Sequence, residues 1–240
     1  MIRRSRAKPR SPFLRFSSSP EVIRLVVLMY VRFPLSLGNV EDLLFERGID
    51  IRHETVRQWW NRFGPVFAGG IRRQRVSRMR GFRHWRWHLD EMYVKLNGEM
   101  VCLWRAVDHE GEVLESHVTR TRDKAAALRF MRKAMKRHGS PEAIATDGLR
   151  SYGAAMDELG CHDRQELGRW ANNRVENSHL PFRRRERAMQ RFRRMSSLQK
   201  FASVHASLQN HFSLERHLIA RATYKERRSA AWAEWGLLAS

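Results

Sequence analysis

The stretch RWHLDEMYVKLNGEMVCLWRAVDHEGEVLESHVTR (residues 86–120) decides the fold. Polar and apolar residues alternate through RWHLDEMYVKL, which is typical of a strand with one buried face. Asn97-Gly98 then predicts a tight hairpin turn. MVCLWRAVD and EVLESHVTR read as two further strands around the turn HEGE. Residues 86–120 therefore predict three consecutive antiparallel strands.

Beyond these strands the pattern changes to helices separated by one short strand. DKAAALRFMRKAMKRHG is amphipathic and ends at Gly139, AIAT is an apolar strand ending at Asp147, and SYGAAMDELG is a second helix. A further helix holds Glu176, and residues 196–218 carry an apolar helical stripe. This order predicts an α/β fold over residues 85–220, a ribonuclease-H-like domain with a mixed sheet and flanking helices. We expect residues 221–240 to form a C-terminal tail.

Residues 18–64 predict an all-α helix-turn-helix domain preceded by a flexible basic arm at residues 1–17. Two helices lead to a turn in which Gly48 supplies the left-handed conformation. A third helix follows at about residues 53–63. Its outward polar side chains are the expected DNA contacts, namely Thr55, Arg57, Gln58, Asn61 and Arg62. The alternative is a three-helix core whose polar face is only solvated.

Residues 65–84 are rich in Arg and Gly, and their Arg residues show no stripe of the kind that a core requires. We expect a basic linker that follows the DNA phosphates, with Arg72 and Arg73 among the contacts.

Composition narrows the choice of partner. The chain has 240 residues, 46 Lys and Arg against 25 Asp and Glu, and a formal net charge of +21. Such an excess favours nucleic acid as the partner, with an anionic membrane surface second. The apolar share of 42% excludes a disordered basic tail. No apolar run is long enough for a membrane span, and no secretory signal is visible.

The two cysteines, Cys102 and Cys161, favour reduced thiols over a disulfide. Cys161-His162 alone is too sparse for a zinc site. We therefore expect a cytoplasmic protein.

Three acids stand out in so basic a chain: Asp90, Asp147 and Glu176. On the first strand, alternation puts Asp90 on one face and Glu91 on the other, so the two are not expected to bind one metal. Asp147 ends a buried strand, where an α/β sheet opens its crevice. If the first and fourth strands are neighbours, the two aspartates meet at the centre of the sheet. Oxygen ligands of this kind suit Mg²⁺.

Each acid also has a simpler interpretation. Asp90 could pair with Arg86, Asp147-Gly148 could be a turn, and Glu176 could cap its helix or pair with Arg174. The three acids in this order, on these elements, indicate a metal site more specifically than any one of them does alone.

The chain resembles bacterial insertion-sequence transposases of the DDE type, most closely the IS-six family. The segments that carry the resemblance lie between about residues 20 and 220: LSLGNVEDLLFERGIDIRHETVRQWW, WHLDEMYVKLNGEMVCLWRAVDHEGEVLESHVTRTRDKAAALRFM, TDGLRSYGAAMDELG and NNRVENSHLPFRRRERAMQRFR. The resemblance implies that Asp90, Asp147 and Glu176 are the catalytic acids. It also implies a basic residue seven positions after the glutamate, which is Arg183.

The segment 182–195 contains seven Arg and one Glu. A solvated helix face is the plain interpretation, but a grip on phosphate is favoured beside a metal site. The expected contacts are Arg183, Arg184, Arg185 and Arg187.

These expectations define a DDE transposase that binds a pair of Mg²⁺ ions, for which Mn²⁺ can substitute. It would cleave DNA at the terminal inverted repeats of an insertion sequence and transfer the strands to target DNA. The resemblance further implies a homo-oligomer that pairs two ends, a replicative pathway and a bacterial, nucleoid-associated location. The alternatives are a catalytically inactive, domesticated DNA-binding protein and a ribonuclease-H-like nuclease.

Overall fold

The computed structural model describes residues 11–78, 86–168, 173–189, 192–212 and 220–238. Its central element is a five-stranded mixed sheet with the strand order β3-β2-β1-β4-β5. The strands are β1 (Arg86–Leu96), β2 (Glu99–Asp108), β3 (Val113–Thr119), β4 (Ala143–Thr146) and β5 (Gln165–Leu167). The first three are antiparallel, whereas β4 runs parallel to β1 and β5 parallel to β4. The predicted strands are confirmed, and the short strand β5 is an addition to them.

The hairpin between β1 and β2 forms where the Asn-Gly pair predicted it. Asn97 has φ 51° and Gly98 has φ 97°. Both values are positive, as a two-residue turn that follows the right-handed twist of the strands requires.

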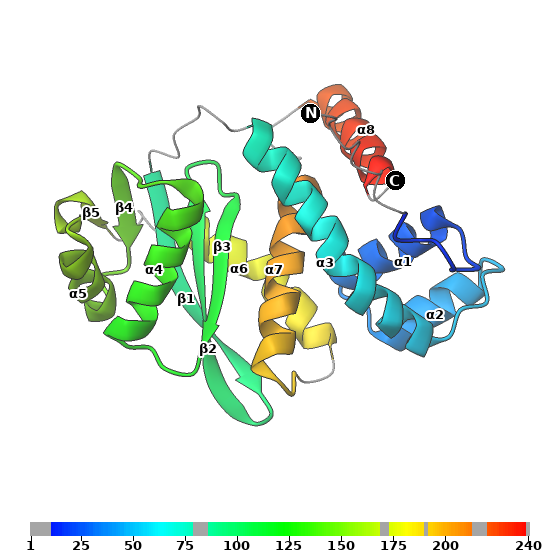
Figure 1. Cartoon of the computed structure of the whole chain (residues 1–240), viewed down its shortest axis with the longest axis horizontal. Coiled ribbons are helices and arrows are strands. Elements are labelled where there is room, and N and C mark those ends of the chain that lie inside the picture. Colours follow the sequence, from blue (N-terminus) through cyan, green and yellow to red (C-terminus); the bar gives the residue numbers. More distant parts are fainter. Residues whose placement is uncertain (1–10, 79–85, 169–172, 190–191, 213–219, 239–240) are drawn as a thin grey trace, which may run out of the picture.

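Helices cover both faces of the sheet (Figure 1). One face packs on α4 (Lys124–His138) and α5 (Arg150–Leu159), where Trp87 and Leu89 of β1 lie in one core cluster with Phe130 and Tyr152. The other face packs on α6 (Asn173–Ala188) and α7 (Met195–Phe212). Strand alternation therefore divides the residues of β1 as predicted. The mixed sheet with helices on both faces confirms the ribonuclease-H-like fold.

Three helices precede the sheet: α1 (Pro20–Arg32), α2 (Leu37–Phe45) and α3 (His53–Arg78). Ser19 caps α1, and Ser36 forms a capping box with Asn39 at the start of α2. Gly48 follows α2 with φ 75°, the left-handed conformation that the sequence predicted for this turn.

The third helix is longer than predicted. It does not end near Phe63 but continues to Arg78, so most of the predicted linker 65–84 is helical. Phe63, Phe67 and Ile71 are buried at intervals of four residues, which continues one helical stripe into the N-terminal core. The many Gly and Arg residues of this segment made the apolar stripe hard to recognise in the sequence. Residues 79–85 of the predicted linker lie outside the described residues.

The N-terminal helices and the sheet share one hydrophobic core. Helix α7 lies between them (Figure 1), and Phe201 belongs to the same cluster as Phe63 of α3 and Val94 of β1. The boundaries predicted at residues 64 and 84 therefore do not separate two independent cores.

Both predicted terminal extensions contribute to this core. Residues 221–240 are not a free tail, because Arg221–Leu237 form α8 and the Trp235 ring lies 4.9 Å from that of Phe67. Within the predicted arm 1–17, Phe13 stacks on Phe63 with ring centroids 5.0 Å apart. Residues 1–10 of that arm lie outside the described residues. Apolar side chains anchor both segments, a feature that their basic composition concealed.

Two further expectations concern the whole chain. Across the described residues, none of the helices combines the length and the apolar character that a membrane crossing needs. Cys102 and Cys161 are both buried, free thiols, as predicted.

Candidate active site

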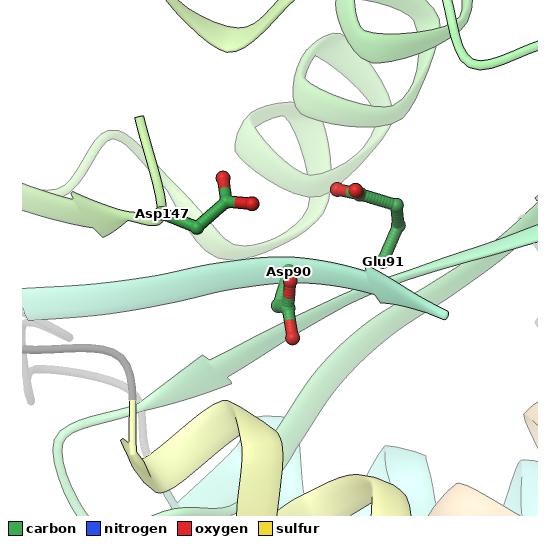
Figure 2. A group of neighbouring side chains, drawn as sticks. All are labelled: Asp90, Glu91 and Asp147. Atoms are coloured by element: carbon green, nitrogen blue, oxygen red, sulfur yellow. The ribbon is translucent and has the colours of Figure 1, made fainter. Parts of the chain in front are cut away.

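Asp90 and Asp147 lie on neighbouring parallel strands. In the pairing of β1 with β4, His88 is opposite Ala145. Asp90 and Asp147 each stand two residues further along, so the register brings them to the same level of the sheet (Figure 2). The predicted meeting of the two aspartates at the sheet centre is therefore confirmed, because the first and fourth strands are neighbours.

The turn after β4 holds the Asp147 side chain. The backbone N–H of Leu149 donates to Asp147 Oδ1 at 3.0 Å, and Gly148 takes the positive φ of 82° that the turn requires. Asp147 and Gly148 thus form a turn, as the simpler interpretation of this pair predicted. The turn uses Oδ1 of Asp147, and Oδ2 lies 3.8 Å from Nη2 of Arg122.

Glu91 is closer to the aspartates than strand alternation suggested. One carboxyl oxygen from each of Asp90, Glu91 and Asp147 lies within 4.8 Å of the others. Asp90 points to the α6 face of β1, whereas Glu91 and Asp147 point toward one another on the opposite side (Figure 2). The faces were predicted correctly. That Asp90 and Glu91 do not bind one metal stays a prediction, although the longer Glu91 side chain reaches toward Asp147.

The electrostatics of Asp90 fit a cation site. Burial raises the pKa of its carboxyl to about 7, and the nearby charges of Glu91, Asp147 and Glu176 contribute in the same direction. Carboxylates crowded in this way repel one another until a cation lies among them. The three oxygen donors are of the kind that Mg²⁺ and Mn²⁺ prefer, so the residues fit a divalent metal.

Glu176 enters from α6, which packs across β1 and β2. It lies in the first turn of that helix and is exposed. Its charge contributes to the raised pKa of Asp90, but among the described residues it is not in the group of carboxylates within 4.8 Å. The structure thus brings the two aspartates together, while Glu176 acts on Asp90 through its charge and lies outside the group of close carboxylates.

His179 is a site residue that the sequence argument missed. It lies one helical turn after Glu176, and its Nδ1 is 3.6 Å from Asp90 Oδ2. Burial, with smaller effects from Arg105 and Arg183, lowers the pKa of His179 to about 3, so the imidazole is neutral. The Glu-x-x-His spacing on one helix face was the available signal.

Arg122 is the second residue that was missed. It lies between β3 and α4, its Nε donates to Glu91 Oε1 at 2.6 Å, and its Nη2 is 3.8 Å from Asp147 Oδ2. Burial raises the pKa of Glu91, and the charge of Arg122 opposes that effect. The TRTRD segment has no periodicity that could have placed this guanidinium.

The predicted DNA-contacting residues of α3 differ in exposure. Arg57, Gln58, Asn61, Arg62 and Arg73 are exposed, whereas Thr55 and Arg72 are half-buried. Arg57 pairs with Glu54 at 3.2 Å, and the Arg62 guanidinium lies 5.3 Å from the centre of the Phe16 ring. Burial lowers the pKa of Arg72, which lines a pocket against β3 together with Arg137.

The arginines of α6 fall into two classes. Arg184 and Arg187 are exposed, and Arg183 pairs with Glu186 at 2.9 Å. Arg185 is only 1% exposed and donates from Nε to the backbone oxygen of Tyr30 at 2.6 Å. The prediction that Arg185 contacts DNA is therefore wrong, because its side chain joins α6 to α1 in the core.

Helix α6 runs unbroken from Asn173 to Ala188 with Pro181 inside it. Glu176 and Arg183 therefore share one helix, as the predicted interval of seven requires. Arg183 lies two turns beyond Glu176 on the same face.

The chain is similar in sequence to known transposases. Residues 84–215, more than half of the chain, match the family DDE_Tnp_IS240, described as a DDE domain. The transposase for insertion sequence-like element IS431mec of Staphylococcus aureus is 28% identical over 167 residues, covering 66% of this chain and 71% of the relative. An uncharacterised protein of Methanocaldococcus jannaschii, MJ0017, is 28% identical over 197 residues, covering 81% of this chain and 85% of the relative.

Among solved structures, the catalytic domain of Mos1 mariner transposase is 12% identical with a TM-score of 0.35, covering 71% of this chain and 92% of that chain. The strand order β3-β2-β1-β4-β5, and not this likeness, identifies the ribonuclease-H-like fold. The family match spans both aspartates and Glu176. The chain therefore belongs to the DDE-domain family of insertion-sequence transposases.

Proposed function

We propose that this DDE transposase cuts DNA at the terminal inverted repeats of an insertion sequence and joins the freed 3′-ends to target DNA. Asp90, Asp147 and Glu176 are the proposed catalytic acids. The observation that carries the proposal is the parallel pairing of β1 with β4, which places Asp90 and Asp147 at one level. Burial, together with the charges of Glu91, Asp147 and Glu176, raises the pKa of Asp90, which supports a cation site there.

The proposed cofactor is a pair of Mg²⁺ ions, for which Mn²⁺ can substitute. When bound, such ions activate the attacking oxygen and stabilise charge on the leaving oxygen. Asp90 and Asp147 would hold them from the sheet, and Glu176 would complete the ligand set from α6. In the turn at Gly148, the backbone N–H of Leu149 donates to Asp147 Oδ1, so Oδ2 is left for a metal ion.

Exposed basic side chains are the proposed grip on DNA. Arg184 and Arg187 lie on the helix that carries Glu176, so phosphates bound to them lie near the acids. Arg183 would join them once it leaves Glu186. These contacts do not read sequence, because phosphates are the same at every base pair.

Recognition of the element ends is assigned to α3. Its exposed polar face carries Arg57, Gln58 and Asn61, on the second helix of the helix-turn-helix formed with α2. Arg57→Ala and Gln58→Ala should reduce the preference for terminal-repeat DNA over random DNA by about 1–3 kcal/mol per lost base contact. An equal loss on both DNAs in a competition binding assay would contradict base reading.

Joining two ends of one element to a target requires two active sites held together. We therefore also propose a homo-oligomer on DNA, a replicative pathway and an association with the nucleoid that the charge of +21 supports.

The test of the chemistry is Asp147→Asn, which keeps the shape of the side chain and removes its charge. The variant should lose Mg²⁺-dependent strand transfer and still bind labelled element ends. Asp163→Asn, at an exposed position in the short helix η1 (His162–Arg164), is the control and should transfer normally. Undiminished transfer by Asp147→Asn would reject the metal-ligand role.

The same assay separates the alternatives. A nuclease would cut the labelled ends without joining them to the target plasmid, and a domesticated DNA-binding protein would bind them equally in Mg²⁺ and in EDTA. Cleavage and joining that both require Mg²⁺ are expected here.

A further inference from the structure

Arg122 stands between a buried acid and the edge of the proposed active site. Its Nε donates to Glu91 Oε1 at 2.6 Å, and its Nη2 contacts the same oxygen. The Nη2 atom also lies 3.8 Å from Asp147 Oδ2. The guanidinium therefore bridges a core carboxylate and a proposed metal ligand.

Glu91 explains why the guanidinium stays in this place. The Glu91 side chain is 3% exposed, and a carboxylate so deeply buried needs a charged partner to offset its lost hydration. Arg122 is that partner. The pair fixes the direction of the guanidinium plane, because two of its nitrogens meet one carboxylate oxygen.

The backbone around Arg122 is held on both sides. Thr119 at the end of β3 donates from Oγ1 to the backbone oxygen of Thr121 at 2.7 Å. Asp123 caps α4 by accepting from the backbone N–H of Ala126 at 2.8 Å. Arg122 thus extends from a short, tethered connection and not from a long loop.

The exposure of Arg122 separates it from the arginines that serve the core. Arg105 and Arg185 are each 1% exposed and donate to backbone oxygens, those of Ser178 and Tyr30. The Arg122 side chain is 35% exposed. Nε and Nη2 of its guanidinium contact Glu91, and Nη2 also lies 3.8 Å from Asp147 Oδ2. The guanidinium carbon lies 5.9 Å from the centre of the Tyr93 ring. A planar, partly exposed guanidinium fork matches the spacing of two oxygens of a phosphate.

We propose that Arg122 binds the scissile phosphate at the active site, and that Glu91 is the positioning residue that holds it there. The inference rests on the proposed function, since it takes Asp147 as the residue to which the phosphate is brought. Fixed donors aimed at phosphoryl oxygens stabilise the charge that develops on them during transfer. Arg122 is thus a substrate-binding catalytic residue beyond the three acids.

The test compares Arg122→Ala and Arg122→Lys with Arg120→Ala in strand transfer from pre-cleaved element ends. Arg120 is the matched control, since it lies two residues earlier, is exposed, and pairs with Glu99 at 3.2 Å away from the acids. Both Arg122 variants should lower the single-turnover rate about 100-fold, with the Kd for end DNA changed less than about threefold. Lysine should fail to rescue because it lacks the fork. Arg120→Ala should stay within about twofold of the parent.

A second measurement detects the phosphate contact itself. The parent enzyme should distinguish the two phosphorothioate stereoisomers at the scissile position, and Arg122→Ala should lose most of that discrimination. Glu91→Gln should show an intermediate rate, about tenfold below the parent, with discrimination partly kept. Melting temperatures of all variants separate these effects from unfolding.

Three results would overturn the inference: a rate for Arg122→Ala equal to that of Arg120→Ala, full rescue by lysine, or unchanged discrimination between stereoisomers. Asp147→Asn, assayed in parallel, separates the two proposals. If Asp147→Asn is inactive and Arg122→Ala is normal, only the role of Arg122 fails. If Asp147→Asn transfers strands, the proposed function itself fails.

Discussion

At the scale of single residues, Asp90 shows how a buried carboxyl group among other acids destabilises the folded protein when it is ionised. Its folded pKa of about 7 lies well above the ordinary value, so the folded protein binds this proton more tightly than the unfolded chain does. The Asp90 contribution to stability is therefore present at low pH and is lost as pH rises toward about 7. Burial and the neighbouring acids cause this loss, and a divalent cation would reverse it.

Replacing Asp90 by Asn should therefore stabilise the metal-free protein at pH 8 by roughly 1–3 kcal/mol, and the gain should shrink as pH falls below about 7. Adding Mg²⁺ should raise the melting temperature of the parent more than that of Asp90→Asn. Thermal unfolding across pH, with and without Mg²⁺, measures both effects. A gain that does not vary with pH would argue against an elevated Asp90 pKa.

Adjacent arginines on α6 should behave in opposite ways. Arg185→Ala removes the donor to the backbone oxygen of Tyr30 and a guanidinium 4.5 Å from the Tyr30 ring centre, so it should lower the free energy of unfolding by about 2–3 kcal/mol. Arg184→Ala, on the exposed side, should leave stability unchanged. It should weaken DNA binding at all sequences and reduce the salt dependence by about one phosphate contact.

Denaturant titrations and binding at several salt concentrations distinguish the two variants. Loss of DNA affinity in a fully folded Arg185→Ala protein would restore Arg185 as a DNA contact.

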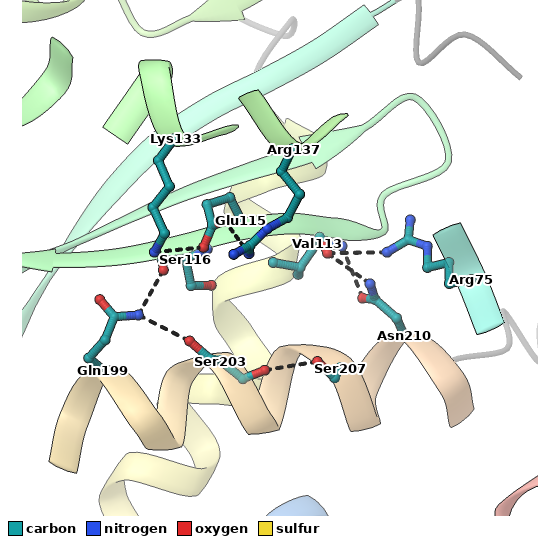
Figure 3. A network of polar contacts seen from close by, with 10 residues as sticks. All are labelled: Arg75, Val113, Glu115, Ser116, Lys133, Arg137, Gln199, Ser203, Ser207 and Asn210. Carbon is teal, nitrogen blue, oxygen red and sulfur yellow. Dashed lines mark hydrogen bonds and ion pairs between the residues drawn. The ribbon is translucent and has the colours of Figure 1, made fainter. Parts of the chain in front are cut away.

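At the scale of elements, α7 closes the open edge of the sheet. The edge strand β3 presents backbone groups that would otherwise attract another strand. Asn210 accepts from the backbone N–H of Val113 at 2.9 Å and donates to its oxygen at 2.8 Å. Gln199 accepts from the N–H of Val118 at 2.9 Å. It also donates to the oxygen of Ser116 at 2.9 Å (Figure 3). Two amide side chains thus replace a neighbouring strand.

The double variant Gln199→Ala with Asn210→Ala should lose about 2–4 kcal/mol of stability, because four backbone groups lose an amide partner and only the oxygen of Val113 keeps another, Arg75. It should also self-associate more readily than Gln209→Ala, a control on the same helix. Urea unfolding and light scattering against concentration give the two readouts. Unchanged association would mean that β3 is protected in another way.

At the scale of the whole molecule, the shared core couples the N-terminal helices to the catalytic sheet. Phe201 of α7 contacts Trp60 on one side and Phe182 of α6 on the other, with ring centroids 5.6 and 6.0 Å apart. Helix α3, which we propose reads the DNA, is therefore connected to the acids through packed side chains and not through a loose linker. Helix α8 completes this core from the C-terminal end.

Trp235→Ala should lower the free energy of unfolding by about 3–5 kcal/mol, since Trp235 is 2% exposed between Phe67 and Phe212. Trp232→Ala, at 40% exposure on the same helix, should cost less than about 1 kcal/mol. Because the core is continuous, helical and aromatic signals should fall together in one transition. Two separate transitions would show independent domains.

The sequence by itself determined the features that depend on local period and turn chemistry. Alternation along β1 assigned Asp90 to its face, Asn97-Gly98 specified the hairpin, and the order of strands and helices led to the ribonuclease-H-like sheet. Local chemistry suffices for these features because a strand repeats every two residues and a helix every 3.6.

Only the tertiary structure decided which distant segments meet. It placed Arg122 against Glu91 and Asp147, buried Arg185, continued α3 past Pro65 and packed α8 into the core. An Arg side chain combines a charged head with an apolar stem. The presence of Arg in a basic segment of the sequence therefore does not show whether its side chain faces DNA, an acid or the core. Its partner comes from another part of the chain, and packing alone brings the two together.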